Sequence, residues 1–189
     1  MEFKGKVALI TGGNDGIGLS ISKALLDKNY KVIIIDKNIH NATEINKENK
    51  NLYVFCCDIC NEKEVTETFK KVWKITNTID VLINSAGIGA FGNFDKMDIE
   101  IFRRVMDVNF FGTVRIIKEC LPSMLKNENG HIINISSISG KVALPGSSAY
   151  CCSKWALYCS TAEIALFIEW YIVCCLRTRD LLFAYITVS

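Results

Sequence analysis

The N-terminal stretch constrains the fold of this chain more than any other part of it. Residues 6–11, KVALIT, form a short β-rich run, and the glycines that follow lead into a helical apolar pattern over residues 19–29. This order predicts a strand, a tight glycine turn and a helix. Such a turn lets the backbone approach a pyrophosphate, and the N–H groups of the helix N-terminus face the phosphates. A glycine turn alone can be merely a tight loop, but its place between strand and helix favours a dinucleotide site.

Strand patterns recur along the rest of the chain and alternate with helical ones. Short β-rich runs cover residues 31–35, 52–57, 79–84 and 131–136, while helical patterns cover 62–75 and 98–125. Strands that alternate with helices build a parallel sheet with right-handed crossovers and helices on both faces. A chain of 189 residues suffices for one such domain. We therefore predict an α/β, Rossmann-type doubly wound parallel sheet with its cleft at the carboxyl ends of the strands.

The stretch from Ser137 to Lys154 carries side chains suited to acid–base chemistry. If the residues from Ser148 onward are helical, Tyr150 and Lys154 are spaced i, i+4 and emerge on the same helix face. A tyrosine hydroxyl normally loses its proton near pH ~10, and an ammonium beside it favours the phenolate. Ser137 lies where the strand HIINIS gives way to a loop. We therefore expect the serine, the tyrosine and the lysine to converge.

A Tyr-x-x-x-Lys spacing alone is common on helices and usually marks a solvated face. Here it occurs together with the T-G-x-x-x-G-I-G pattern of residues 11–18, the N-S-A-G segment of residues 84–87, and Ser137. The joint pattern resembles the short-chain dehydrogenase/reductase family, because each motif lies in its expected strand–turn–helix context. The glycine at position 13 makes the turn similar to that of hydroxyprostaglandin dehydrogenases and the related insect alcohol dehydrogenases.

The resemblance implies an oxidoreductase that transfers a hydride between NAD and a secondary alcohol or ketone. The implied catalytic residues are Asn109, Ser137, Tyr150 and Lys154. In the family the tyrosine acts as the base, the lysine supports it and holds the nicotinamide ribose, and the serine hydrogen-bonds the reacting oxygen. The asparagine distorts its helix and anchors a water that relays protons to the lysine. This mechanism needs no metal ion.

A second set of residues is expected to hold the dinucleotide. A carboxylate at Asp36, about 20 residues past the glycine turn, would accept hydrogen bonds from the adenine ribose hydroxyls and repel a 2′-phosphate, which favours NAD over NADP. The alternative is that Asp36 merely ends a strand, and Lys37 is a cation that would favour a phosphate. By resemblance, Asp58 meets the adenine amino group and Ile59 lines the ring, whereas Ser85 departs from the family's second asparagine. The implied cofactor-binding set is Gly12, Asn14, Asp15, Gly16, Ile17, Gly18, Asp36, Asp58, Ile59, Asn84, Ala86, Gly87, Tyr150 and Lys154.

Composition argues against several other functions. The chain has 22 basic and 20 acidic residues and a net charge of +2, which gives no electrostatic reason to expect nucleic acid. Its N-terminus shows no apolar segment of signal-peptide length, so we expect a cytoplasmic protein. The nine cysteines are then expected to stay reduced and to be buried as small apolar residues. The C-x-x-C of residues 57–60 lacks a second pair or a nearby histidine to complete a zinc site.

The resemblance covers residues 4–165 and fades from Leu166 onward. We therefore divide the chain into a dehydrogenase domain, residues 1–165, and a divergent tail, residues 166–189. In the family, the catalytic helix is followed by a strand with a Val-Asn-x-x-x-Pro-Gly pattern, helices that cover the substrate, and a final strand. These patterns are missing from the tail, and the two prolines of the chain are Pro122 and Pro145. A truncated enzyme with weak or no activity is expected, and the alternative function is a dinucleotide-binding or interaction protein.

The tail and the partners give the remaining expectations. The runs IVCCL and FAYITV are β-prone and can fill the sheet edge beside the fifth strand. The apolar stretch 164–176 is too short to span a membrane and contains Glu169, so no membrane partner is expected. Family members pair through the long helices that bear the asparagine and the tyrosine, which implies a homodimer. The substrate class stays open among prostaglandin, steroid, retinoid and small alcohol.

Overall fold

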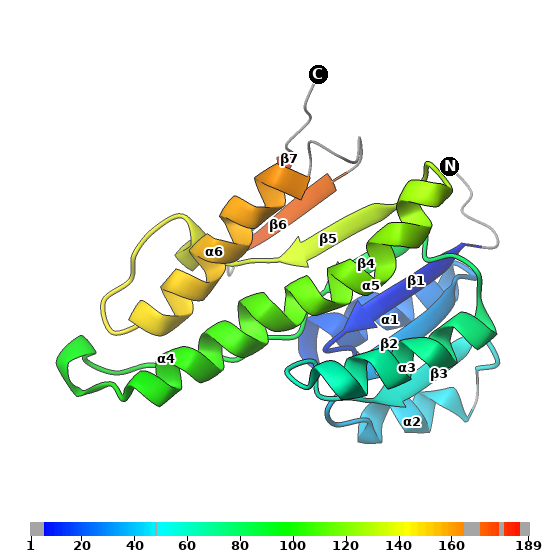
Figure 1. Ribbon diagram of the computed structural model, residues 1–189, viewed down its shortest axis with the longest axis horizontal. Coiled ribbons are helices and arrows are strands. Elements are labelled where there is room, and N and C mark those ends of the chain that lie inside the picture. The colour runs from blue at the N-terminus through cyan, green and yellow to red at the C-terminus, as the bar shows by residue number, and fades with distance from the viewer. Residues whose placement is uncertain (1–5, 48, 165–170, 178–179, 186–189) are drawn as a thin grey trace.

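Helices and strands alternate along the chain, as the sequence patterns predict (Figure 1). The structure is a computed structural model that describes residues 6–47, 49–164, 171–177 and 180–185. Its strands are β1 (Val7–Thr11), β2 (Lys31–Asp36), β3 (Leu52–Cys56), β4 (Val81–Asn84), β5 (His131–Ile135), β6 (Tyr171–Arg177) and β7 (Asp180–Tyr185). Its helices are α1 (Gly16–Asp27), α2 (His40–Asn46), α3 (Glu62–Ile75), α4 (Ile99–Met106), α5 (Thr113–Lys126) and α6 (Ser148–Ile164), with short helical segments η1 (Phe94–Lys96), η2 (Asp107–Gly112) and η3 (Ile138–Gly140).

The strands form one twisted sheet in the order β3-β2-β1-β4-β5-β6-β7. All neighbouring pairs are parallel except β6 with β7. Thr11 pairs with both Ile35 and Asn84, and Asn84 pairs with Asn134, so the carboxyl ends of the central strands meet at one edge. This arrangement confirms the predicted Rossmann-type fold.

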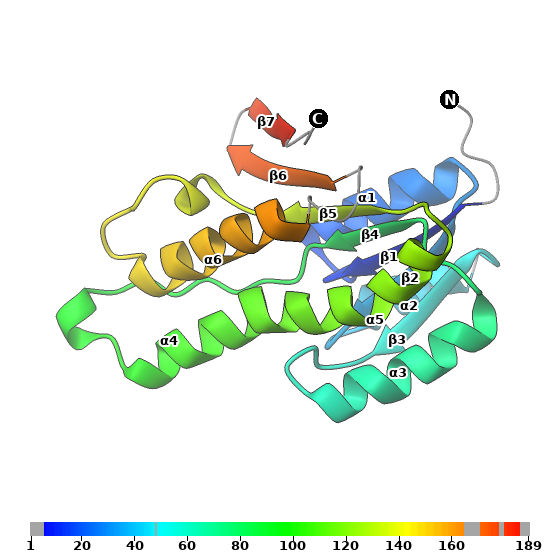
Figure 2. The same ribbon diagram turned by 45° about the horizontal axis from the view of Figure 1, so that its top comes forward.

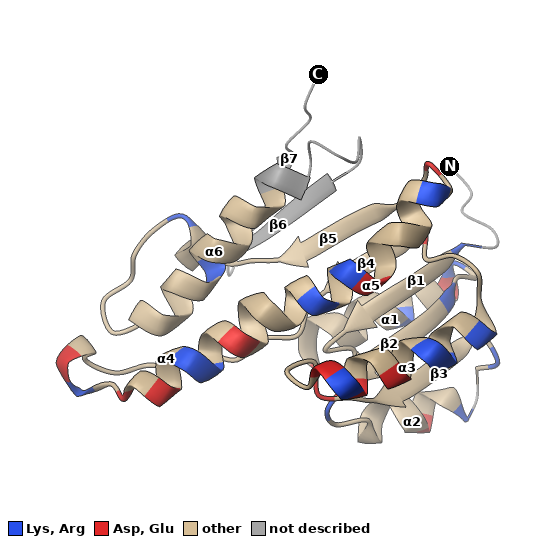
Figure 3. Ribbon diagram, in the orientation of Figure 1, with Lys and Arg blue, Asp and Glu red and all other residues tan. Residues whose placement is uncertain are grey.

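Each face of the sheet is covered by its own set of helices (Figures 1 and 2). Along β1 and β2, Ala8, Ile10 and Ile34 pack toward α1 and α2, whereas Leu9 and Ile33 pack toward α3 and α5. The alternation follows from the two-residue period of a strand, and it explains why both strands are apolar throughout. Charged residues lie mainly on the helices and loops rather than on the central strands (Figure 3).

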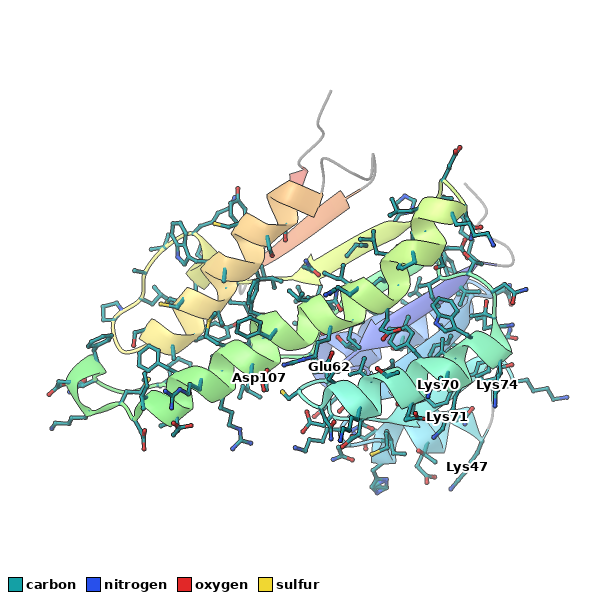
Figure 4. The ribbon with its side chains drawn as sticks, in the orientation of Figure 1. Lys47, Glu62, Lys70, Lys71, Lys74 and Asp107 are labelled. Atoms are coloured by element: carbon teal, nitrogen blue, oxygen red, sulfur yellow. The ribbon has the colours of Figure 1, made fainter. Side chains whose placement is uncertain are left out.

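Helix α3 shows how a surface helix contributes to this core. Its buried residues Val65, Phe69 and Val72 recur at helical spacing and pack against the sheet. Lys70, Lys71 and Lys74 lie on its solvent side (Figure 4). Asn61 caps the helix by accepting hydrogen bonds from the N–H groups of residues 63 and 64. The predicted bounds of this helix, 62–75, are confirmed.

The long helix predicted over residues 98–125 is present, but a π-helical segment interrupts its regular α-helical geometry. It runs through α4, η2 and α5, and η2 is a π-helical segment that contains Asn109. Pro122 was predicted to mark either a kink or the end of this helix. It does not mark the end, because α5 continues to Lys126. The first helix also begins at Gly16 rather than at residue 19, since Asp15 caps it.

The β-prone runs of the tail extend the sheet beside β5, which confirms the prediction that they can fill this edge in place of the family's usual C-terminal strands. β6 pairs in parallel with β5, and β7 pairs with β6 as an antiparallel neighbour. The β-prone character of both runs accounts for this, because the exposed edge of β5 offers unpaired N–H and C=O groups. Among the described residues, no helix is long and apolar enough to cross a membrane.

The cysteines are less uniformly buried than expected. Cys57, Cys120 and Cys151 are buried, but Cys152 is exposed on α6 and Cys60 is only partly buried. Cys151 and Cys152 are neighbours on one helix, so they point to different sides of it. Within the part of the chain that the structure describes, no group of three or more His, Cys, Asp or Glu residues could hold a metal ion.

Candidate active site

The glycine turn brings β1, α1 and the end of β4 into close contact. Gly12 has a φ of +68°, and a Cβ atom there would lie 2.7 Å from the backbone of Ala86. A Cβ atom on Gly18 would lie 2.1 Å from the carbonyl oxygen of Gly12. Both positions therefore require glycine. The Asp15 carboxylate accepts a hydrogen bond from the N–H of Gly16 at 2.7 Å, which starts α1 beside the turn.

A cleft of about 1290 Å³ opens at the carboxyl ends of the strands, beside this turn. Loops after β1, β2, β3 and β4 form one side, and α4 with η2 forms the other. Of the predicted cofactor-binding residues, the following line it: Gly12, Asp15, Gly16, Ile17, Asp36, Asp58, Ile59, Ala86 and Gly87. Asn14, Gly18, Asn84, Tyr150 and Lys154 are not among the lining residues. The volume suits an extended dinucleotide.

Asp36 ends β2 with its carboxylate fixed by two backbone donors. The N–H of Asn14 and the N–H of Asn38 each donate to one of its oxygens at 3.0 Å. The Asn14 side chain turns away from the cleft, since its amide oxygen accepts from the N–H of Ala42 at 3.0 Å and its residue is 4% exposed. Asn14 thus positions Asp36 and α2, and a contact of its side chain with a cofactor remains a prediction.

Asp58 lies at the same end of the cleft and is paired with Lys37. The Lys37 ammonium donates to an Asp58 oxygen at 2.7 Å, and the N–H of Cys60 donates to the other oxygen at 3.0 Å. The hydrogen bond from Lys37 holds the pKa of Asp58 below its ordinary value, and the same bond raises the pKa of Lys37. This ion pair was not predicted, because it depends on the register of β2 and β3.

Asn109 joins the π-helical segment to the loop that follows β4. It is fully buried, and its amide group exchanges two hydrogen bonds with the backbone of Ile88, at 2.8 and 2.9 Å. Its Nδ2 also donates to the Ser153 hydroxyl at 2.9 Å, and that hydroxyl donates to the Tyr150 carbonyl at 2.7 Å. Asp107, labelled in Figure 4, begins the same segment and receives a hydrogen bond from Arg115 at 2.8 Å. The resemblance implied a distorted helix at Asn109, and η2 is that distortion.

Lys154 and Tyr150 lie on the first turns of α6, one turn apart. The Lys154 ammonium is buried, donates to the Ile135 carbonyl at 2.9 Å, and lies 5.7 Å from the centroid of the Tyr150 ring. A Cβ atom on Gly87 would lie 3.5 Å from this ammonium and 3.3 Å from the Asn109 oxygen. The lysine and the asparagine therefore meet at Gly87, a residue that lines the cleft.

Ser137 follows β5 and caps the short helix η3, with its hydroxyl accepting from the N–H of Ser139 at 3.2 Å. Helix α6 packs against η3, and a Cβ atom on Gly140 would lie 2.9 Å from the Lys154 carbonyl. This close packing holds the serine segment against the helix that bears Tyr150. Ser137 and Tyr150 are both partly exposed.

A network of hydrogen bonds between buried amide side chains joins β4, β5 and α6 next to the site. This network was not predicted from the sequence. Asn84 donates to Asn134 at 2.8 Å across β4 and β5, and Asn134 donates to Thr161 of α6 at 3.3 Å. The amide oxygen of Asn84 is buried and has no hydrogen-bond partner among the described residues. The signal available was Asn134 within an apolar strand, because a buried amide needs partners.

These features fit a nicotinamide dinucleotide. The glycine turn and the N-terminus of α1 provide N–H groups for phosphates, and Asp36 provides an acceptor for ribose hydroxyls. The unpaired oxygen of Asn84 is a further buried acceptor at the strand ends. A phenol and a buried ammonium stand beyond Gly87, so the arrangement is suited to proton transfer next to a bound dinucleotide.

Comparison with known proteins supports the same conclusion. The family profile described as short chain dehydrogenase matches residues 6–172. An uncharacterized oxidoreductase of Staphylococcus saprophyticus is 37% identical over 166 residues, which cover 85% of this chain and 71% of that protein. Other curated relatives are longer, and the chain spans as little as 50% of their length.

Solved structures show the same fold. NAD+-bound xylitol dehydrogenase superposes with a TM-score of 0.85 at 27% identity and covers 93% of this chain and 72% of its own. ElxO with NADP bound superposes with a TM-score of 0.80 at 31% identity, over 85% of this chain and 67% of its own. With the family profile matching most of its residues and the cleft built from the family's motifs, this chain belongs to the short chain dehydrogenase family.

Proposed function

We propose that this protein is an oxidoreductase that moves a hydride between NAD and a secondary alcohol or ketone. The observation that carries the proposal is the meeting of Lys154 and Asn109 at Gly87, on the edge of the cleft, with Tyr150 one helical turn from Lys154. When bound, the nicotinamide supplies hydride acceptance or donation. The protein supplies the proton transfer and the positioning.

The proposed roles follow from the contacts of each side chain. Tyr150, as phenolate, takes the hydroxyl proton of the alcohol, and the buried Lys154 ammonium stabilises that negative charge. Ser137 is proposed to hydrogen-bond the reacting oxygen from the loop after β5. Asn109 fixes the loop that carries Ile88 and supports proton return to the lysine.

NAD is the proposed cofactor because of Asp36. Its carboxylate ends β2 in the cleft, and two backbone donors hold it there. It would accept hydrogen bonds from ribose hydroxyls and repel a 2′-phosphate. The relatives include one structure with NAD+ and one with NADP, so the family alone does not fix the preference.

We propose that the loops after β4 and before α6 form an apolar rim for the substrate, because the second loop leads directly into the helix that bears Tyr150. The N–H of Gly92 donates to the Gly146 carbonyl at 2.9 Å, which joins the loop after β4 to the loop before α6. These two loops expose large apolar side chains: Phe91, Phe94, Val142 and Leu144. Apolar substituents of the alcohol carbon would lose water against such a rim. We therefore favour an apolar secondary alcohol over a polyol.

A homodimer is part of the proposal. Helices α4 and α6 pack together, and they expose Ile101 and Trp155. Burying these side chains against a second copy would remove apolar surface from water. Light scattering at the mass of a dimer is expected, and a monomer at all concentrations would contradict this part. A cytoplasmic location also remains a prediction.

A second candidate function is a dinucleotide-binding protein without turnover. It is favoured by the lack of a Pro-Gly pattern after the sixth strand, since the two prolines lie in α5 and before α6. In the family that turn contacts the nicotinamide carboxamide. A reacting group misplaced by even ~1 Å can cost on the order of a hundredfold in rate.

The experiment that separates the two candidates is a panel of secondary alcohols assayed with NAD beside a calorimetric NAD titration. The oxidoreductase proposal predicts NADH formation, fastest with apolar alcohols, and its loss in Lys154→Met. NAD binding without NADH from any alcohol in the panel would favour the second candidate. Failure to bind NAD would contradict both.

A further inference from the structure

We propose that Asp58 sets the cofactor preference of this site by holding Lys37 in an ion pair, which keeps that cation from binding a 2′-phosphate. The inference rests on the proposed function and deepens it. It makes Asp58 a specificity-determining residue, in addition to any contact it makes with adenine.

Lys37 is a cation well placed to offset the effect of Asp36, and the side chains of Arg103 and Arg104 also line the cleft. It follows Asp36 directly at the end of β2, and both residues line the cleft. A carboxylate that repels a phosphate would therefore stand beside an ammonium that attracts one. Left unpaired, such an ammonium would reduce or cancel the discrimination that Asp36 provides.

The structure gives Lys37 another partner. Its ammonium lies 2.7 Å from an oxygen of Asp58, and the lysine side chain is 74% exposed while that of Asp58 is 28% exposed. The carboxylate is itself held in place. Its second oxygen accepts from the N–H of Cys60 at 3.0 Å, and the N–H of Asp58 donates to Glu64 at 2.9 Å.

The backbone keeps the two residues in reach of each other. Asp36 pairs with Cys56 at the end of the β2–β3 ladder, and the N–H of Cys57 donates to the Asp36 carbonyl at 2.9 Å. Lys37 and Asp58 thus leave neighbouring strands at the same sheet edge. Strand register thus brings the two side chains within reach of each other.

The test is a double-mutant cycle read as the ratio of the dissociation constants for NADP and NAD, measured by calorimetric titration. Asp58→Asn keeps the shape of the side chain, releases Lys37, and should shift this ratio toward NADP by roughly fivefold. Lys37→Gln in the otherwise unchanged protein should move the ratio by less than about twofold, since the lysine is already occupied. In the Asp58→Asn background, Lys37→Gln should reverse the gain.

A matched control separates the pair from a general effect of charge. Glu44 of α2 forms a similar exposed ion pair with Lys47 at 2.7 Å, and neither residue lines the cleft. Glu44→Gln should leave the ratio unchanged.

Three outcomes would overturn the inference. The first is a ratio that stays constant in Asp58→Asn, and the second is a gain that survives the removal of Lys37. The third is a fall in NADP affinity of roughly fivefold in Lys37→Gln alone, which would show that the lysine already serves a phosphate. If Asp58→Asn also weakens a contact with adenine, NAD and NADP lose the same affinity, and this loss cancels in the ratio of their dissociation constants. Failure of the unchanged protein to bind either dinucleotide would contradict the proposed function itself.

Discussion

Replacing Asn109 with alanine should destabilise the protein, because this one side chain joins three parts of the site. It makes three hydrogen bonds, two with the backbone of Ile88 and one with the Ser153 hydroxyl, and it is fully buried. Its loss leaves polar groups of Ile88 without their partner. The π-helical segment that carries it also loses the contact that ties it to the loop after β4.

The magnitude follows from these contacts. A net contribution of about 1 kcal/mol for each hydrogen bond gives about 3 kcal/mol in total. Alanine has the better helix propensity, which returns roughly 0.5 kcal/mol. We therefore expect the free energy of unfolding to fall by about 2 to 3 kcal/mol. Ser153→Ala removes one of these three bonds together with the bond from its own hydroxyl to the Tyr150 carbonyl, and should cost about 2 kcal/mol.

Urea unfolding followed by tryptophan fluorescence measures this difference. Asn93→Ala is the matched control, because Asn93 is exposed and makes no capping hydrogen bond at η1. Its free energy of unfolding should change by less than about 0.5 kcal/mol. An Asn109→Ala protein as stable as the control would refute the structural role given to this asparagine.

Three further predictions use other parts of the structure. Gly18→Ala places a Cβ atom 2.1 Å from the Gly12 carbonyl oxygen and should weaken NAD binding more than tenfold. Gly92→Ala is the control and should not weaken it, because the nearest atom to its Cβ would lie 3.7 Å away. Equal NAD dissociation constants for the two variants in calorimetric titrations would contradict this. Burial lowers the pKa of His131 below its ordinary 6.5. The contribution of its neutral imidazole to the free energy of unfolding should therefore be fully present above pH 6.5 and be lost as the pH falls toward the lowered pKa. Urea midpoints of His131→Gln should show a shallower fall, and parallel curves would count against this account. Burial and the carboxylates of Asp107 and Asp58 raise the pKa of Cys60 to about 12, so iodoacetamide should label it more slowly than the exposed Cys56, Cys152 and Cys159; mass spectrometry showing Cys60 labelled first would contradict this.

Patterns local in the sequence predicted most of the fold. The strand–turn–helix at the N-terminus and the amphipathic helix at residues 62–75 are read from apolar period and turn residues, and both are confirmed. The starts and ends of helices were predicted less accurately. Capping by Asp15 and the continuation of α5 past Pro122 depend on local hydrogen bonds and packing, which the spacing of apolar residues does not reveal. The resemblance to hydroxyprostaglandin dehydrogenases is not confirmed by the relatives found.

The residues of the site were predicted from their motifs, but the hydrogen bonds and ion pairs between their side chains were not. The bond between Lys37 and Asp58 and the bond between Asn84 and Asn134 each cross neighbouring strands. Such contacts follow from sheet register, which a single sequence specifies only through the fold as a whole. The β-prone runs of the tail could be predicted from the sequence, and they supply the sixth and seventh strands.

The central claim is that Tyr150 transfers the proton in an oxidoreductase that binds NAD. The most direct measurement is NADH formation from an apolar secondary alcohol by the unchanged protein and by Tyr150→Phe, with NAD affinity titrated for both. The account predicts turnover in the unchanged protein, none detectable in Tyr150→Phe, and NAD dissociation constants within about threefold of each other, since the cleft contacts remain. Equal turnover in the two proteins, or NAD binding without turnover in the unchanged protein, would contradict it.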